Sequence, residues 1–375
     1  MLNRRTLRIK IMQSLFAFEQ CKQANHLLSQ DFIDDHFQPD LNSMEVQNKE
    51  LLSGQRKVAR QFFDEKFQKP ETKGNSVVIT KTVDEALAIY HKSVKRDFNY
   101  LQKNMLQEVE NLNVLYHSVL GLLMAFAEVA ESDKKVNHRN FASNTWINAF
   151  STNAELKKEL LKAGNWNENM AKVRGWFKDV IKSDILFQKF NEEKSPDLES
   201  QKAIIKHIVR KLILGKSPIH DQYEEDVMRW AEDKDIIKSL VDKTIKSYNE
   251  NTGEITLQKL SLEWEDDKDF MKKLFEATVN LAPELKQLIS KNTRNWEVDR
   301  LPLTDVIIIE MAMAEMINFP GIPVKVSINE YIELAKEYST PKSRQFINGI
   351  LDVLAKELQS LGAVKKSGRG LIDNK

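Results

Sequence analysis

The chain has 375 residues, which at roughly 100–200 residues per domain corresponds to two or three domains with ample room for a buried core. Hydrophobic residues make up 41% and charged residues 30% of it, as in a soluble globular protein. The formal net charge is +1, so any affinity for nucleic acid must come from local clusters of basic residues. The single cysteine, Cys21, excludes an intrachain disulfide, and the sequence contains no His/Cys cluster of the zinc-binding kind.

Helices are favoured over sheets, because the chain has 12 Gly and 9 Pro and therefore few tight turns. The longest apolar stretch, residues 114–130, contains His117 and Ser118 and falls short of the ~20 residues that span a bilayer. We expect a buried helix there and no membrane association. Polar residues also interrupt the apolar positions after the N-terminus, so no export signal is expected and a cytoplasmic location fits.

Residues 3–24 are predicted to form one helix. Its apolar side chains recur at helical spacing: Leu7, Ile11, Leu15 and Phe18. Residues 39–78 are charged and contain Pro70 and Gly74, which predicts short helical pieces joined by a mobile loop.

A middle all-α region is expected after residue 80. Thr82 and Glu85 have the spacing of a capping box and predict a helix start at Val83, with an apolar stripe continuing to Met105. The helix at 114–130 is expected to fold back against it. Further helices are predicted at 152–163, 166–190, 200–214 and 221–248. The first of these begins with a second capping signature, Thr152 and Glu155, and a break is expected at Gly164-Asn165.

Three helices are predicted in the last third of the chain. Residues 301–319 are apolar nearly all round, which predicts a central helix packed on several sides. After the break at residues 320–323, Ser327 and Glu330 have the spacing of a capping box, and Val326 and Tyr331 that of a hydrophobic staple. The third helix is predicted to begin near Pro341 and to turn four side chains inward: Phe346, Ile350, Val353 and Leu354.

These residues resemble the C-terminal three-helix bundle of the NusB family of transcription antitermination factors. The elements IP-x-x-V, INE-x-I-x-LAK and FINGILD occur in order and at family spacing, within roughly residues 262–360. The first helix, NRRTLRIKIMQSLFAFEQ, resembles the family's N-terminal helix, which lies beside that bundle in the fold. The sequence between the first helix and the C-terminal bundle is far longer than a compact family member needs.

The resemblance implies an all-α fold made of helical bundles, with an inserted helical domain. We expect a basic helix of the NusB-like core at 1–25, an inserted all-α region at 26–255, the C-terminal bundle at 256–362 and a basic flexible tail at 363–375. It further implies a protein that binds boxA-type ribosomal RNA together with the small-subunit ribosomal protein that doubles as NusE, within an RNA polymerase antitermination complex. Neither a cofactor nor catalysis is implied.

Candidate RNA contacts occur at both ends of the chain. Arg4, Arg5, Arg8 and Lys10 place four cations in two helical turns, enough for several phosphate contacts, although a solvated charged face is the alternative. Phe16 lies near the line of Arg5 and Arg8 and could stack on an unpaired base or belong to the core. At the C-terminal side the candidates are Lys342, Arg344 and Phe346.

Phe346 and Gly349 each allow two interpretations. Phe346 matches a family position associated with RNA contact, or else faces the preceding helix. Gly349 interrupts a helix at a cost of about 1 kcal/mol, which favours close helix packing over close approach of RNA.

Glu310 and Glu315 are the candidate contacts for the protein partner, because Glu315 matches a family acidic position at the ribosomal-protein interface. Catalysis by this pair is not expected, since residues five apart on a helix do not face one another. Two alternatives remain. One is a protein-binding scaffold without RNA contact, and the other is an accessory module related to rRNA methyltransferases, although the chain lacks their glycine-rich cofactor loop and cysteine motif.

Overall fold

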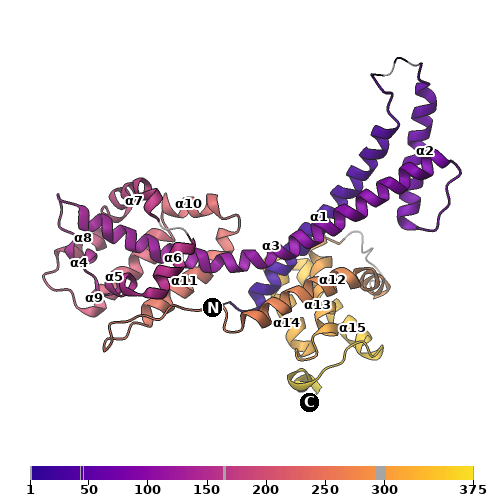
Figure 1. Ribbon diagram of the computed structural model, residues 1–375. Coiled ribbons are helices and arrows are strands. Elements are labelled where there is room, and N and C mark those ends of the chain that lie inside the picture. Colours follow the sequence, from indigo (N-terminus) through magenta and orange to yellow (C-terminus); the bar gives the residue numbers. More distant parts are fainter. Residues whose placement is uncertain (1, 43, 45, 164–165, 293–300, 375) are drawn as a thin grey trace. The chain divides into compact units, whose positions relative to one another are not determined.

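The computed structural model describes residues 2–42, 44, 46–163, 166–292 and 301–374. These residues are mostly helical and form no β-strand beyond an isolated bridge between Asn249 and Glu254, which confirms the all-α class. The chain divides into two compact units (Figure 1). The middle unit comprises Met1–Arg4 and Gln107–Asp267, and the bundle unit comprises Arg5–Leu106 and Lys268–Lys375.

The bundle unit is built from helices of both ends of the chain. The N-terminal side supplies α1 (Arg4–His36), α2 (Lys49–Gln68) and the first part of α3 (Val77–Ser132). The C-terminal side supplies α12 (Trp264–Asn292), α13 (Leu303–Asn318), α14 (Val324–Tyr338), α15 (Pro341–Ser360) and the 3-10 helix η5 (Gly368–Asn374). Helices α1, α3 and α12 each contribute residues to both units.

An aromatic cluster joins α1, α3 and α12 inside the bundle unit. The Phe18 ring lies edge-on to Phe98 with centroids 5.8 Å apart, and the Phe98 and Phe275 centroids are 5.2 Å apart. Such ring pairs contribute about 0.5–1.5 kcal/mol beyond the area that they bury. The predicted packing of the first helix with the C-terminal helices is therefore confirmed.

Helix α13 is the core of the C-terminal bundle. Every residue from Asp305 to Met316 is buried, and α13, α14 and α15 all contact one another. The nearly all-round apolar sequence predicted this central place. Pro341 occupies the first turn of α15 as predicted, where its missing N–H removes no intrahelical hydrogen bond.

Helix α1 continues to His36, beyond the predicted end at residue 24, because its second half has tertiary partners. The Asn25 amide donates to the Asp97 carboxylate of α3 at 2.8 Å, and Ile33 is buried in one cluster with Phe63 of α2. Burial of an apolar face stabilises helices more than intrinsic propensity does. Helix α1 therefore continues for as long as it has residues of α2 and α3 to pack against.

Helix α3 is continuous, so the predicted start at Val83 and the predicted fold-back after Met105 were wrong. The Thr82 hydroxyl donates to the Val78 carbonyl inside the helix at 3.0 Å, and residues 106–113 contain neither Gly nor Pro to end it. Among the described residues, α3 is the helix long and apolar enough to cross a membrane. Since 67% of its most apolar stretch is buried, it matches the core helix of a globular unit equally well.

The middle unit packs short helices around the second part of α3. They are α4 (Arg139–Ala142), α5 (Thr145–Thr152), α6 (Ala154–Ala163), η1 (Trp166–Asn169), α7 (Met170–Trp176), η2 (Phe177–Ile181), α8 (Ile185–Glu192), α9 (Leu198–His207), η3 (Ile208–Ile213), α10 (Ile219–Asp226) and α11 (Trp230–Lys246). The helix predicted at 166–190 is thus divided. Asn153, and not Thr152, caps α6 by accepting from the Leu156 amide at 2.8 Å. The break expected at Gly164-Asn165 lies outside the described residues.

The described part of the C-terminal tail is packed, whereas a flexible tail was expected. The Ser367 amide donates to the Pro320 carbonyl at 3.0 Å, and the Lys366 ammonium donates to the Phe319 carbonyl at 3.1 Å. The carbonyls after the last turn of a helix have no intrahelical partner, so they are free to accept these bonds. The tail therefore lies against the turn between α13 and α14.

Candidate nucleic-acid interface

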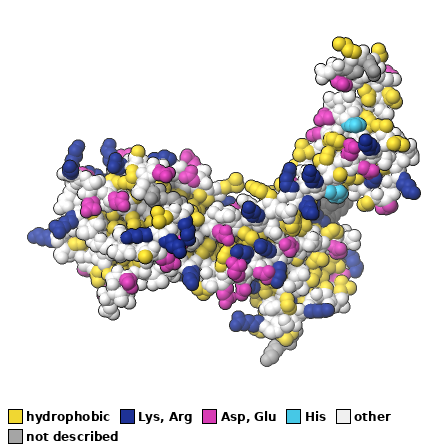
Figure 2. Space-filling view, viewed as in Figure 1, with side chains coloured by type: hydrophobic (Ala, Val, Ile, Leu, Met, Phe, Trp, Pro, Cys, Tyr) yellow, Lys and Arg dark blue, Asp and Glu magenta, His cyan; other side chains and the backbone are white. Residues whose placement is uncertain are grey.

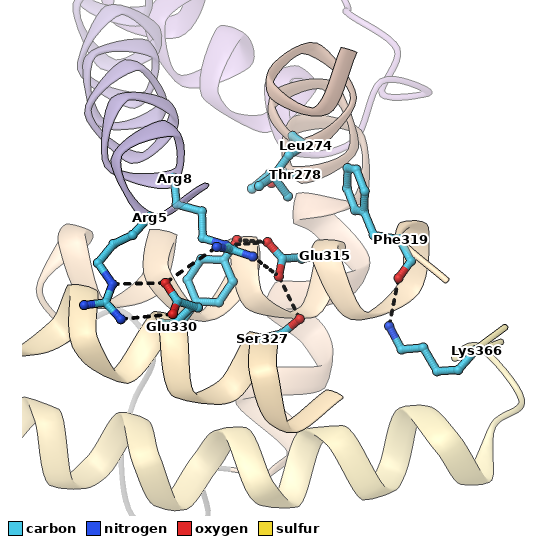
Figure 3. Close-up of polar contacts among 10 residues, drawn as sticks. Arg5, Arg8, Leu274, Thr278, Glu315, Phe319, Ser327, Glu330 and Lys366 are labelled. Atoms are coloured by element: carbon cyan, nitrogen blue, oxygen red, sulfur yellow. Dashed lines mark hydrogen bonds and ion pairs between the residues drawn. The ribbon is translucent and has the colours of Figure 1, made fainter. Parts of the chain in front are cut away.

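A buried ion pair ties α1 to α13. The Arg8 guanidinium donates from Nε and Nη2 to the two Glu315 carboxylate oxygens at 2.7 and 2.8 Å (Figure 3). Only 3% of the Arg8 side chain and none of the Glu315 side chain is exposed. Two parallel bonds of this kind fix both distance and orientation. This pair joins residues separated by 307 positions in the sequence.

Helix α14 completes the shell around the Glu315 carboxylate. The Ser327 hydroxyl donates to Oε1 at 2.7 Å and the Tyr331 hydroxyl donates to Oε2 at 3.0 Å. A buried carboxylate needs such partners, because burying a bare charge is very costly. Ser327 is therefore not the predicted capping residue, and Tyr331 is not part of a staple. Helix α14 already begins at Val324.

A second arginine pair lies at the edge of this network. Arg5 Nε and Nη2 donate to Glu330 at 3.0 and 2.9 Å, and Arg8 Nη1 is 3.6 Å from the same carboxylate. The Arg5 side chain is 38% exposed, so the two arginines differ in depth although they lie one turn apart. Glu330 is thus an ion-pair partner and not the predicted capping glutamate.

The network keeps its arginines charged. Burial alone would lower the pKa of Arg8, but the hydrogen bonds and the charge of Glu315 outweigh it and raise this pKa. The pKa of Tyr331 is raised, first by burial and then by the charge of Glu315, so its hydroxyl stays protonated as a donor. Arg8 also lies over two aromatic rings, with Cζ 5.5 Å from the Phe270 centroid and 5.8 Å from that of Tyr331.

The remaining candidates on α1 differ in accessibility. Lys10 is 1% exposed, so it belongs to the interior with Arg8 and does not present its charge to a nucleic acid in this conformation. Arg4 is exposed, but it falls in the middle unit. The Phe16 side chain is 39% exposed, which leaves part of the ring free to stack on a base.

Helix α15 presents its candidates toward solvent. Thr340 caps it by accepting from the Ser343 amide at 3.2 Å, Lys342 is exposed, and Arg344 and Phe346 are half-buried. A Cβ added at Gly349 would meet nothing within 4 Å, so the close helix packing predicted there is absent. Val353 is 46% exposed and does not point inward as predicted. Positions 342, 346, 349 and 353 follow helical spacing along one face.

One carboxylate links the basic groups of α1 and α15. The pKa of Glu333 on α14 is lowered chiefly by its hydrogen bond with Lys336 and further by the charges of Arg5 and Arg344. Arg5 and Arg344 are therefore close enough to act on the same group. Guanidinium groups on neighbouring helices are suited to contact phosphates.

The two predicted partner carboxylates are both buried, which removes the exposed acidic surface that the prediction required. Glu315 is enclosed by Arg8, Ser327 and Tyr331. Glu310 is 3% exposed, and burial raises its pKa to about 7, against a weaker lowering effect of Lys286. The Lys286 ammonium is 4.0 Å from Glu310 Oε1, and this oxygen has no hydrogen-bond partner among the described residues.

The sequence contains one signal for this network, the position of Glu315. A glutamate inside a helix that is apolar all round must find a buried cation, because an isolated buried charge is not tolerated. That reasoning predicts a basic partner for Glu315. It does not identify Arg8, since Arg4, Arg5 and Lys10 lie within the same two turns.

Residues 227–356 match the family described as the NusB family. The chain is 51% identical over 85 residues to the transcription antitermination protein NusB of Chloroherpeton thalassium, covering 23% of this chain and 40% of that protein. The protein of the same name from Salinibacter ruber is 41% identical over 95 residues, covering 25% and 59%. The one from Natranaerobius thermophilus is 45% identical over 75 residues, covering 20% and 54%.

The matched part thus corresponds to between 40% and 59% of these relatives' lengths. No solved structure gives a significant match to the chain.

Proposed function

We propose that this chain, whose residues 227–356 belong to the NusB family, is a transcription antitermination factor that binds boxA-type RNA together with the ribosomal protein NusE. It would act by binding and not by catalysis, in the cytoplasm, as part of an RNA polymerase antitermination complex. The name of the relatives supports the antitermination role, and the RNA and protein partners are inferred from the family resemblance.

The observation that carries the proposal is the Arg8–Glu315 pair. It joins the first helix to the α13–α15 bundle across an insertion of more than 200 residues. The two segments that resemble the family are thereby one structural unit, as an RNA-binding NusB core requires. The middle unit leaves this connection intact.

The proposed RNA contacts are the accessible members of the predicted set. They are Phe16 on α1, the edge arginine Arg5, and Lys342, Arg344 and Phe346 on α15. Arg8 and Lys10 instead support the interior of the unit. On the face shown in Figure 2, basic and acidic side chains are interspersed over both units, so this face presents no continuous basic field.

The ribosomal protein must contact other exposed groups of the bundle unit, because Glu310 and Glu315 are buried in this conformation. A charge reversal at Glu315 would therefore disturb the fold before it tested an interface. Charge changes at exposed residues are the appropriate probe of that partner.

A gel-shift titration of the full chain with boxA-type RNA, with and without NusE, tests the proposal. Replacing Lys342 and Arg344 by Ala should weaken binding and reduce the salt slope by about 0.7 for each lost phosphate contact. The matched control replaces Lys92 and Lys103, which are exposed on α3. Equal loss in both double variants would remove Lys342 and Arg344 from the RNA site. No RNA binding in either condition would refute the RNA function and favour a protein-binding scaffold.

A further inference from the structure

The middle unit contains a cavity of about 400 Å³ that the proposed RNA and protein contacts do not use. It lies between α3, the start of α6 and the extended segment 257–261, with Trp264 at one side. All of its lining residues belong to the middle unit. The volume is within the range of about 300–1,000 Å³ that is usual for small-molecule sites.

Three carboxylates line the cavity: Glu110, Glu155 and Glu159. Glu159 is paired with the Lys162 ammonium at 2.6 Å. Glu110 and Glu155 make no ion pair with any residue that the structure describes, and the lining contains one cation, the exposed Lys259. The cavity therefore has an excess of negative charge.

An aromatic ring accompanies the carboxylates. Trp264 Nε1 donates to Glu110 Oε1 at 3.3 Å, which holds the indole beside that carboxylate. Tryptophan provides the best side-chain face for a cation, and this attraction is larger when the cation is desolvated. Carboxylates and an indole face together are suited to an organic cation.

A buried histidine lines the same cavity with its hydrogen-bonding capacity unused by the described residues. His117 lines it and is 4% exposed, yet its ring nitrogens form no hydrogen bond with any described residue. Its contacts are a ring contact with Tyr116, at 4.7 Å between centroids, and electrostatic effects of Glu159 and Lys162. Burial is the largest effect on the pKa of His117 and lowers it, so the neutral imidazole offers a hydrogen-bond acceptor.

A metal ion is a poorer occupant than an organic cation. The described groups close enough together to share one ion are His220, Asp221 and Glu224, which lie elsewhere in the middle unit. The cavity carboxylates and His117 are more widely spaced. A planar guanidinium has five donors on one rigid frame and can reach several separated acceptors at once.

We propose that this cavity binds a guanidinium group, with Glu110 and Glu155 as charged acceptors, His117 as a neutral acceptor and Trp264 as the stacking face. The group could belong to a free arginine-like molecule or to an arginine side chain of a partner protein. The site lies in the middle unit and does not depend on RNA binding.

Isothermal titration of the full chain with N-acetylarginine amide and its neutral isostere, N-acetylcitrulline amide, tests this site. The arginine compound should bind about tenfold more tightly, since charge-assisted hydrogen bonds are roughly twice as strong as neutral ones. Glu155→Gln should weaken its binding about fivefold while keeping the fold, because Glu155 is exposed. The control is Glu131→Gln, an exposed glutamate at the end of α3 that does not line the cavity.

A second titration with a glycine- and serine-flanked arginine pentapeptide distinguishes the two sources. Equal affinity for the amide and the peptide supports a small-molecule site, and much tighter binding of the peptide supports a partner's side chain. Equal binding of the arginine and citrulline compounds overturns the proposal. Equal effects of Glu155→Gln and Glu131→Gln, or displacement of the arginine compound by millimolar Mg²⁺ or Zn²⁺, also overturn it.

Discussion

Removing one member of the Arg8–Glu315 pair should destabilise the bundle unit strongly. Arg8→Met keeps much of the apolar stem but leaves the Glu315 carboxylate buried, with the hydroxyls of Ser327 and Tyr331 as donors. Breaking a buried pair in this way costs about 3–5 kcal/mol of unfolding free energy. Glu315→Gln should also destabilise the unit, because it leaves the buried guanidinium with only the more distant, partly exposed Glu330 carboxylate at 3.6 Å as its counter-ion.

The double variant should recover most of that loss. With Arg8→Met and Glu315→Gln together, the buried charges are gone. The amide oxygen of the new glutamine can accept from one of the two hydroxyls, and its amide nitrogen can donate to the other. We expect a coupling free energy of at least about 2 kcal/mol between the two changes. Arg5→Met is the matched control, since its pair with Glu330 is partly exposed and should contribute about 1 kcal/mol or less.

Hydrogen exchange of α13 amides under increasing urea is the suitable assay, because a chain of two units need not unfold in one step. The reasoning is refuted if Arg8→Met destabilises α13 no more than Arg5→Met does. The same double variant also separates support from RNA contact. It should bind boxA-type RNA normally, and a lower affinity with an intact α13 would show that Arg8 contacts the RNA directly.

Two further predictions concern a buried acid and the tail. The pKa of Glu310 is raised from 4.5 to about 7, so the folded protein binds the Glu310 proton more tightly than the unfolded chain does. The free energy of unfolding should therefore fall by up to about 3 kcal/mol as the pH rises from 4.5 through 7. Urea titrations of Glu310→Gln should lack this loss. A Cβ at Gly370 would collide with the Pro320 carbonyl oxygen, so Gly370→Ala should release the tail and expose it to proteolysis. Gly349→Ala is the control, because a Cβ there would meet no atom within 4 Å. It should leave the tail protected and stabilise α15 by about 0.5–1 kcal/mol.

Local sequence patterns were sufficient to place two helices of the C-terminal bundle, α13 and α15. An all-round apolar stretch identified α13 as the central helix, and Pro341 marked the start of α15. These features depend on residues a few positions apart. They were predictable because propensity, capping and periodicity all act over that range.

Features set by distant partners were not predictable from the same patterns. The second half of α1 is helical because Asn25 and Ile33 meet α2 and α3, and Thr82 has a capping spacing but lies inside α3. The candidate site shows the same limit. Arg5 and Arg8 lie one turn apart with equal charge, yet their side chains are 38% and 3% exposed. Their difference arises from residues more than 300 positions away.

The Arg8–Glu315 pair therefore positions α1, a role that its net contribution to the free energy of unfolding does not reflect. A buried ion pair adds little stability compared with a well-packed apolar pair, but displacing one partner leaves two uncompensated charges. If α1 slid by one turn along the bundle, Arg8 would leave Glu315, and Arg5 could not replace it without abandoning Glu330. We infer that this penalty fixes the register of α1. Because Phe16 lies two turns beyond Arg8 on the same helix, the pair also fixes where its exposed ring stands relative to α15. The proposed base-stacking residue, Phe16, and the proposed phosphate-binding helix, α15, can form one RNA site only while that register holds.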